Sequence, residues 1–153
     1  MTRVAIALGS NLGDRERHLR EAAARLGTVV SSLRLSSFHE TAPVGVTGDQ
    51  PPFLNAALAG MTELSAGALL DWLLRTEREF GRERPFPGAA RTLDLDLILY
   101  GDAVITEPPG LIVPHPRFRE RTFVLDPLAE VAGDWVDPVT SMTVGALRAQ
   151  LQR

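Results

Sequence analysis

The ten residues RTLDLDLILY, at positions 91–100, constrain the fold of this chain more than any other segment. Every second residue from Leu93 to Leu99 is leucine, and Asp94 and Asp96 lie between the leucines. Successive side chains of a β-strand point to opposite faces, so the alternation predicts a strand whose leucine face is buried. The other face then presents two carboxylates whose Cα atoms are roughly 6.5–7 Å apart.

The remaining elements pair with this strand or cover it. Apolar alternation predicts three earlier strands, and apolar residues at helical spacing predict helices that begin after Asp14 and Ser65 and end at Gly27 and Gly81. The predicted strands cover residues 3–8, 29–38 and 53–61. The order strand, helix, strand, strand, helix, strand is that of a ferredoxin-like βαββαβ sandwich.

Further short elements follow the Asp strand. We predict two short strands within 104–113 and helices near 121–132 and 143–152. At 153 residues, without repeats or a long linker, the chain is expected to form a single α+β domain over residues 1–153.

The cationic composition excludes several kinds of chemistry. All 16 cationic side chains are arginine, and the chain contains neither lysine nor cysteine. A Schiff-base lysine, a thiol nucleophile, a disulfide framework, a cysteine-based zinc site and a Walker A loop are therefore excluded. The net charge of −3 argues against general nucleic-acid binding, and no apolar run approaches the roughly 18 residues that span a bilayer. We expect a cytoplasmic monomer that binds neither nucleic acid nor membranes.

Arginines flank the Asp strand on both sides in sequence. Arg82, Arg84 and Arg91 precede the carboxylates, and three more arginines lie at 117–121. Carboxylates favour Mg²⁺, and a metal surrounded by arginines suits phosphoryl transfer, which depends on positioning and charge neutralisation. The alternatives are incidental acids on a solvent-facing strand, solvated arginines, and an arginine excess set by codon use or stability.

His115 lies between two prolines and directly before the second arginine group. In that position it is a candidate donor to a phosphate oxygen or a leaving group, although a single histidine near a strand end is more often structural. His18 and His39 lack such a context, and we interpret both as structural.

Five segments of the chain resemble the 6-hydroxymethyl-7,8-dihydropterin pyrophosphokinase family. They are ALGSNLGDR, F-x-x-T-x-P-x-G from Phe38, FLNAA from Phe53, RTLDLDL from Arg91, and VPHP with R-x-F from Arg121. They occur in order over about residues 4–132, and their combination is much more specific than any one of them.

The resemblance implies a ferredoxin-like enzyme of folate biosynthesis. Such an enzyme transfers the β,γ-pyrophosphoryl group of ATP to the hydroxymethyl oxygen of the pterin and leaves AMP. By similarity, Asp94 and Asp96 hold two Mg²⁺ ions that bridge the ATP phosphates and orient the hydroxyl group. Arg82 and Arg91 then stabilise the moving charge.

The resemblance also implies roles in substrate binding. ATP would be bound by Arg84, His115 and Arg121 at its phosphates and by Glu77 near its adenosine end, together with the two catalytic arginines. The pterin would lie between Phe53 and Phe123. Asn55 would read its polar edge, and backbone groups from Thr41 to Val44 would complete the slot. Stacking between aromatic faces and an amide partner suit a flat heteroaromatic ring.

The chain departs from the family pattern before the Asp strand. Residues 88–91 read GAAR where the family usually has a WGPR-like stretch, so the tryptophan of the lid is missing. Pro116 stands where an aromatic hydroxyl is common, and the loop lysine is absent.

Two other functions fit a ferredoxin-like fold. One is a nucleotidyl transferase or cyclase, since such palms also carry paired metal-binding aspartates. The other is a non-catalytic ligand-binding module. An RNA-binding sheet would carry basic and aromatic residues where this chain has Asp94 and Asp96.

Overall fold

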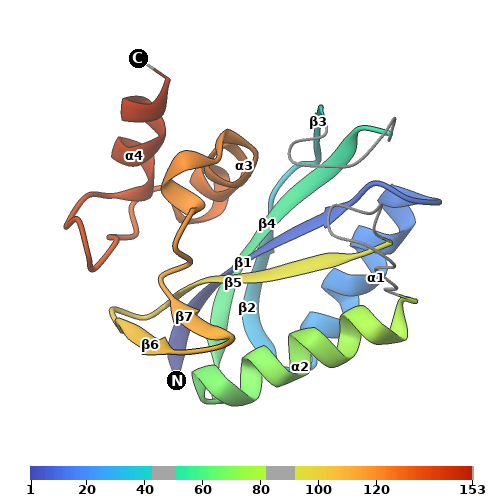
Figure 1. Cartoon of the computed structure of the whole chain (residues 1–153), viewed down its shortest axis with the longest axis horizontal. Helices are drawn as coiled ribbons and strands as arrows, with labels where there is room; N and C mark the ends of the chain where they lie inside the picture. The colour runs from blue at the N-terminus through green and yellow to red at the C-terminus, as the bar shows by residue number, and fades with distance from the viewer. Residues whose placement is uncertain (43–50, 82–91, 153) are drawn as a thin grey trace.

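The structure, a computed structural model, describes residues 1–42, 51–81 and 92–152. Its elements combine helices with antiparallel strands, as the sequence predicts (Figure 1). In chain order they are β1 (Thr2–Ser10), α1 (Arg15–Leu26), β2 (Val30–Leu35), β3 (His39–Thr41), β4 (Phe53–Thr62), α2 (Ala66–Glu79), β5 (Asp94–Tyr100), β6 (Ile105–Glu107), β7 (Leu111–Val113), the 3-10 helix η1 (Phe118–Glu120), α3 (Thr122–Ala132) and α4 (Val144–Leu151).

One antiparallel sheet has the strand order β2-β4-β1-β5, and β3 pairs with the other end of β4. A separate two-stranded hairpin consists of β6 and β7. The two helices predicted near the sheet begin as expected, since Asp14 caps α1 and Ser65 caps α2 with their side-chain oxygens. Gly81, directly after α2, has a φ of 75°, the left-handed conformation that glycine adopts easily.

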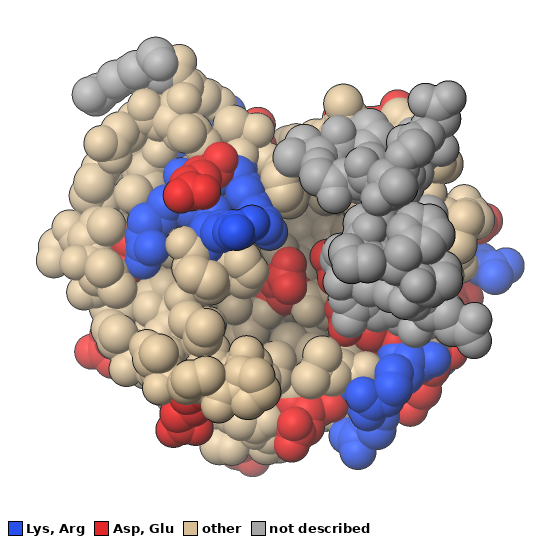
Figure 2. All heavy atoms as spheres, viewed as in Figure 1, with Lys and Arg blue, Asp and Glu red and all other residues tan. Residues whose placement is uncertain are grey.

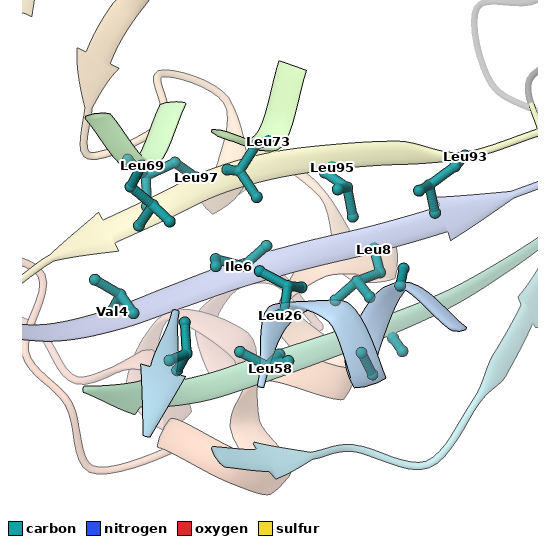
Figure 3. Packing of buried hydrophobic residues seen from close by; sticks show 14 of the residues in the cluster. Val4, Ile6, Leu8, Leu26, Leu58, Leu69, Leu73, Leu93, Leu95 and Leu97 are labelled. Carbon is teal, nitrogen blue, oxygen red and sulfur yellow. The ribbon is translucent and has the colours of Figure 1, made fainter. Parts of the chain in front are cut away.

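The sheet separates two cores. On one face, large aliphatic residues of β1, β4 and β5 pack against α1 and α2 (Figure 3). These include Ile6, Leu8, Leu58, Leu95 and Leu97, all almost completely buried. The opposite face of the sheet carries small residues and packs against α3 and α4 (Figure 1). Those small residues are Ala5, Ala57 and Ala59.

A β-bulge changes the predicted faces of β5. Ala5 pairs with Leu99 but Ile6 pairs with Leu97, so Ile98 is an extra residue in the ladder. The alternation is reset at that point. Leu99 therefore packs in the core under α3, and Tyr100 packs in the core of α1 and α2. The prediction that Leu99 shares the face of the earlier leucines, and Tyr100 that of the aspartates, is wrong because a bulge depends on pairing with β1.

The strand predicted at 29–38 ends early, because β2 covers only Val30–Leu35 and a separate strand, β3, begins at His39. Leu35 of β2 pairs with Leu58, whereas His39 of β3 pairs with Asn55. The segment from β2 to β3 therefore contains one residue more than the stretch of β4 opposite to it. The buried Ser36 bridges the interruption, because its hydroxyl accepts a hydrogen bond from the N–H of Ala57 at 2.8 Å. Over the described part of the chain, no helix combines the length and the apolar character needed to cross a membrane.

Candidate active site

A cavity of about 300 Å³ opens along the free edge of β5. Both Asp94 and Asp96 line it, as predicted for one face of the strand, and both are half-buried. Figure 2 shows a hollow on this face, with acidic atoms over β5 and basic atoms over the segment that leads into α3. A cavity of this volume lies at the lower end of the range for small-molecule sites.

Glu77 of α2 also lines this cavity. Its side chain is almost completely buried, and its Oε2 accepts a hydrogen bond from the N–H of Leu95 at 2.7 Å. This N–H lies on the edge of the sheet, so the carboxylate replaces a neighbouring strand and fixes the backbone between the two aspartates. The contact with the Asp strand was not predicted from the sequence.

The apolar wall of the cavity was also not predicted. Leu70 and Leu74 line it from α2, and Leu111 and Ile112 line it from β7. Leu74 and Ile112 expose 38% and 36% of their surface, which is high for large aliphatic side chains. A sequence signal did exist, because Leu70, Leu74 and Glu77 recur at helical spacing beside the buried stripe of α2.

His115, which lies between β7 and η1 in the chain, also lines the cavity. Its backbone N–H donates to the carbonyl of Ile98 at 3.0 Å, and its Nδ1 accepts from the N–H of Arg117 at 3.1 Å. Burial lowers the pKa of His115 to about 4, and the positive charges of Arg121 and Arg117 act in the same direction against Asp94. The ring is therefore neutral near pH 7, with its proton on Nε2, available as a hydrogen-bond donor.

The arginines after His115 have different environments. The guanidinium of Arg121 lies 5.5 Å from the centroid of the Phe123 ring and close enough to His115 to lower its pKa. Arg119 instead forms a two-point ion pair with Asp137, including an Nη2–Oδ1 distance of 2.9 Å. The side chain of Asp137 is completely buried. Grouping Arg119 with the phosphate-binding arginines is therefore wrong, since its partner anchors η1 to the segment before α4.

The predicted pterin residues gather on the face of the sheet that α3 covers. Asn55, Gly9 and Asp94 are direct partners across β4, β1 and β5, so the three positions form one row. Asn55 is buried, and its amide donates to the Thr41 hydroxyl at 2.6 Å. A Cβ at Gly9 would lie 3.2 Å from Oδ1 of Asn55 and 3.7 Å from Cδ1 of Phe53, so both side chains lie over this glycine.

Phe123, the second aromatic residue predicted for the pterin slot, comes from α3. Phe123 lies in the first turn of α3, is half-buried, and packs against the core under that helix. Phe53 thus lies two residues before Asn55 on β4, and Phe123 lies on α3, which packs on the same face of the sheet. The placement of the pterin between Phe53 and Phe123 stays a prediction.

The N-terminal motif supports the segment that leads into β4. Asn11 is completely buried and donates to the Pro51 carbonyl at 3.4 Å. Arg15 donates to the Pro52 carbonyl at 2.8 Å and forms an ion pair with Glu40 of β3 at 2.9 Å. Four predicted site residues, Val44, Arg82, Arg84 and Arg91, lie outside the described residues.

The donor set of Asp94 and Asp96 fits a magnesium ion that also uses phosphate oxygens and water. Among residues 1–42, 51–81 and 92–152, no group of three or more His, Asp or Glu is arranged to hold a metal. Mg²⁺ commonly takes only one or two carboxylates from a protein when substrate phosphates complete its shell. Two carboxylates that face a cavity meet that requirement.

Comparison with known proteins identifies related sequences. Residues 5–133 match the family model described as 7,8-dihydro-6-hydroxymethylpterin-pyrophosphokinase (HPPK). The 2-amino-4-hydroxy-6-hydroxymethyldihydropteridine pyrophosphokinase of Bacillus subtilis is 48% identical over 128 residues, which are 82% of this chain and 75% of that protein. Its Synechocystis namesake is 40% identical over 95% of this chain and 74% of that protein.

Longer relatives contain a similar segment. The mitochondrial folate synthesis bifunctional protein of Arabidopsis thaliana is 47% identical over 88% of this chain, which spans only 24% of that protein. A crystal structure of wild-type Plasmodium falciparum HPPK-DHPS with SDX-DHP has a TM-score of 0.74 at 13% identity, over 98% of this chain and 43% of that one. The structural match supports the fold alone.

Proposed function

The chain belongs to the 7,8-dihydro-6-hydroxymethylpterin-pyrophosphokinase family, and from this premise we propose the chemistry of its site. The enzyme transfers pyrophosphate to 6-hydroxymethyl-7,8-dihydropterin in folate biosynthesis. ATP is the donor: the hydroxymethyl oxygen loses its proton and bonds to the β-phosphorus, the bond from that phosphorus to the α–β bridging oxygen breaks, and AMP leaves. The observation that supports this most is the pair of cavity-facing carboxylates, of which Asp94 is in one row with Asn55 across the sheet.

We assign the cavity beside β5 to ATP. The apolar wall of Leu70, Leu74 and Leu111 suits a purine ring, and Glu77 lies at the same wall. The neutral His115 donates a hydrogen bond from Nε2, and Arg121 contributes positive charge from the start of α3. Both groups suit phosphate oxygens.

The aspartates are proposed to hold two Mg²⁺ ions. When bound, the metal would neutralise phosphate charge and help to orient the attacking hydroxyl group. The protein contributes the fixed spacing of Asp94 and Asp96, which the backbone contact of Glu77 stabilises. Arg82, Arg84 and Arg91 keep their predicted roles in ATP binding, and those of Arg82 and Arg91 in catalysis, as proposals from the sequence.

We assign the pterin to the slot over Gly9. The amide of Asn55, held by Thr41, offers an acceptor and a donor to the ring edge. Phe53 and Phe123 offer aromatic faces from β4 and α3. Because Asn55 and Asp94 are in one row, a pterin read by Asn55 would direct its hydroxymethyl group toward the carboxylates and the ATP phosphates.

The strand order supports a ferredoxin-like description of the βαββαβ part. In β2-β4-β1-β5 the first and last strands of this unit are neighbours, and both helices cover one face. The monomeric state and the cytoplasmic location stay predictions.

Incubation with ATP, Mg²⁺ and 6-hydroxymethyl-7,8-dihydropterin tests the function. We expect AMP and the pterin diphosphate in equal amounts, and no AMP when the pterin is left out. Release of pyrophosphate without AMP would indicate nucleotidyl transfer or cyclisation instead, and absence of any pterin-dependent product would leave only a binding module. The family match favours the pyrophosphokinase over both.

A further inference from the structure

A polar cluster whose residues do not line the cavity joins α3 to the region between β2 and β3. At its centre is Glu130, in the third turn of α3. Its carboxylate accepts the backbone N–H of Ser37 at 2.9 Å and the hydroxyl of Ser37 at 2.8 Å. Its Oε2 also accepts a short hydrogen bond from Nε2 of His39, the first residue of β3. Residues far apart in sequence are thereby held together.

Because Glu130 is ionised, its carboxylate is the hydrogen-bond acceptor of this cluster, and Ser37 and His39 are the donors. Burial raises the pKa of the Glu130 carboxyl, but hydrogen bonds from Ser37 and His39 lower it by more, so the pKa lies below its ordinary value. An ionised carboxylate only accepts hydrogen bonds, so His39 must carry its proton on Nε2. Hydrogen bonds to an ionised acceptor are stronger than those between neutral groups.

The cluster lies beside the slot that holds Asn55. His39 is the direct partner of Asn55 in the ladder between β3 and β4. Two residues further along β3, Thr41 accepts the Asn55 amide hydrogen bond. On the opposite side, Phe123 lies two turns before Glu130 on the same helix. The cluster thus ties α3, which carries Phe123, to β3, which carries the Thr41 partner of Asn55.

The strand that Glu130 holds needs such support. β3 has only three residues and pairs with β4 alone among the described strands. A strand this short at the edge of a sheet has few backbone hydrogen bonds of its own. The contact with Glu130 fixes the distance between β3 and α3, whereas the hydrogen bonds between β3 and β4 do not fix that distance.

We propose that Glu130 is a positioning residue for the pterin slot, because it holds β3, with Thr41, at a fixed distance from α3. The inference rests on the proposed function, which assigns this slot to the pterin. Glu130 does not touch the substrate in this scheme. It acts through His39 and Thr41 on the amide of Asn55, and a slot held in its binding conformation costs the ligand less to order.

Steady-state kinetics with both substrates test the proposal. We expect Glu130→Ala to raise the KM for the pterin about tenfold, the equivalent of one charge-assisted hydrogen bond, with the KM for ATP and kcat nearly unchanged. Glu130→Gln keeps an acceptor for Ser37 and should recover most of the affinity. His39→Phe, which keeps a ring without the N–H, should raise the pterin KM to a smaller extent and replaces Glu130→Ala if that variant fails to fold.

The matched control is Asp126→Ala. Asp126 is another carboxylate of α3, and it binds Arg148 of α4 at 2.8 Å, away from β3. Its loss should leave the pterin KM unchanged. Equal effects of Glu130→Ala and Asp126→Ala, or an unchanged pterin KM in Glu130→Ala and in His39→Phe, would overturn the inference.

A further variant separates this inference from the proposed function. Asn55→Ala should raise the pterin KM if the slot binds the pterin at all. If Asn55→Ala has that effect and folded Glu130→Ala does not, only the positioning role is wrong. If Asn55→Ala has no effect, or the unmodified protein forms no pterin-dependent AMP, the assignment of the slot is wrong and the inference with it.

Discussion

Replacing Gly9 by alanine should weaken pterin binding without weakening the fold. The added Cβ would lie 3.2 Å from Oδ1 of Asn55, closer than ordinary van der Waals contact, so the amide must move by a few tenths of an ångström. That amide is held by a 2.6 Å hydrogen bond to Thr41, so the movement strains a side chain that has little freedom. A strained side-chain torsion costs about 1 kcal/mol, which corresponds to about a fivefold rise in the pterin KM.

The stability of the Gly9→Ala variant should change in the opposite direction or not at all. Gly9 does not have a positive φ, so alanine can adopt its conformation. Loss of backbone freedom in the unfolded chain then stabilises the variant by about 0.4–1 kcal/mol, which offsets the strain at Asn55. Urea unfolding measures the change in stability, and initial rates at varied pterin concentration measure the rise in the pterin KM.

Gly67→Ala in α2 is the matched control, because a Cβ there would meet only Leu111 at 4.0 Å. It should raise stability by about 1 kcal/mol, the difference in helix propensity, and leave the pterin KM unchanged. A folded Gly9→Ala enzyme with the wild-type pterin KM would refute the argument that the bare glycine makes room for the Asn55 amide. An equal rise in the KM for ATP would also refute it.

Three further variants test other parts of the site. Asp96→Ala should abolish AMP formation while the variant still folds, since its side chain faces the cavity; an active variant would show that the metal assignment is wrong. Glu77→Leu should cost about 1–3 kcal/mol of stability, because the N–H of Leu95 loses its acceptor, and a urea midpoint equal to wild type would argue against that role. Burial raises the pKa of Asp137, but hydrogen bonds from Arg119 and its neighbours outweigh this and lower it. The charged form therefore stabilises the fold above about pH 4, the unfolded pKa, and this contribution is lost as the pH falls through the folded pKa. The stability difference between wild type and Asp137→Asn should shrink from pH 7 to pH 3 in urea unfolding, and a constant difference would contradict the ion-pair argument.

The alternation in residues 91–100 was sufficient to predict the Asp strand, its buried leucine face up to Leu97, and the cavity-facing carboxylates. It was not sufficient beyond Ile98, because the bulge depends on how β5 pairs with β1. The apolar wall of the cavity has a similar cause. Leu74 and Ile112 come from elements far apart in sequence. Neither residue indicates a cavity wall by itself, because the wall forms only when β7 lies beside α2.

The arginines after His115 show most clearly where sequence reasoning stops. Arg119 and Arg121 have the same side chain, are two residues apart, and lie in one charged segment. Their roles differ because a 3-10 turn at Phe118–Glu120 directs Arg119 toward Asp137, while Arg121 lies at the start of α3 beside Phe123. Asp137 is an unremarkable acid in the sequence, and only its complete burial explains why a cation must pair with it. The pattern of arginines thus predicts where positive charge is available, but the burial of the partner decides whether that charge can reach a phosphate.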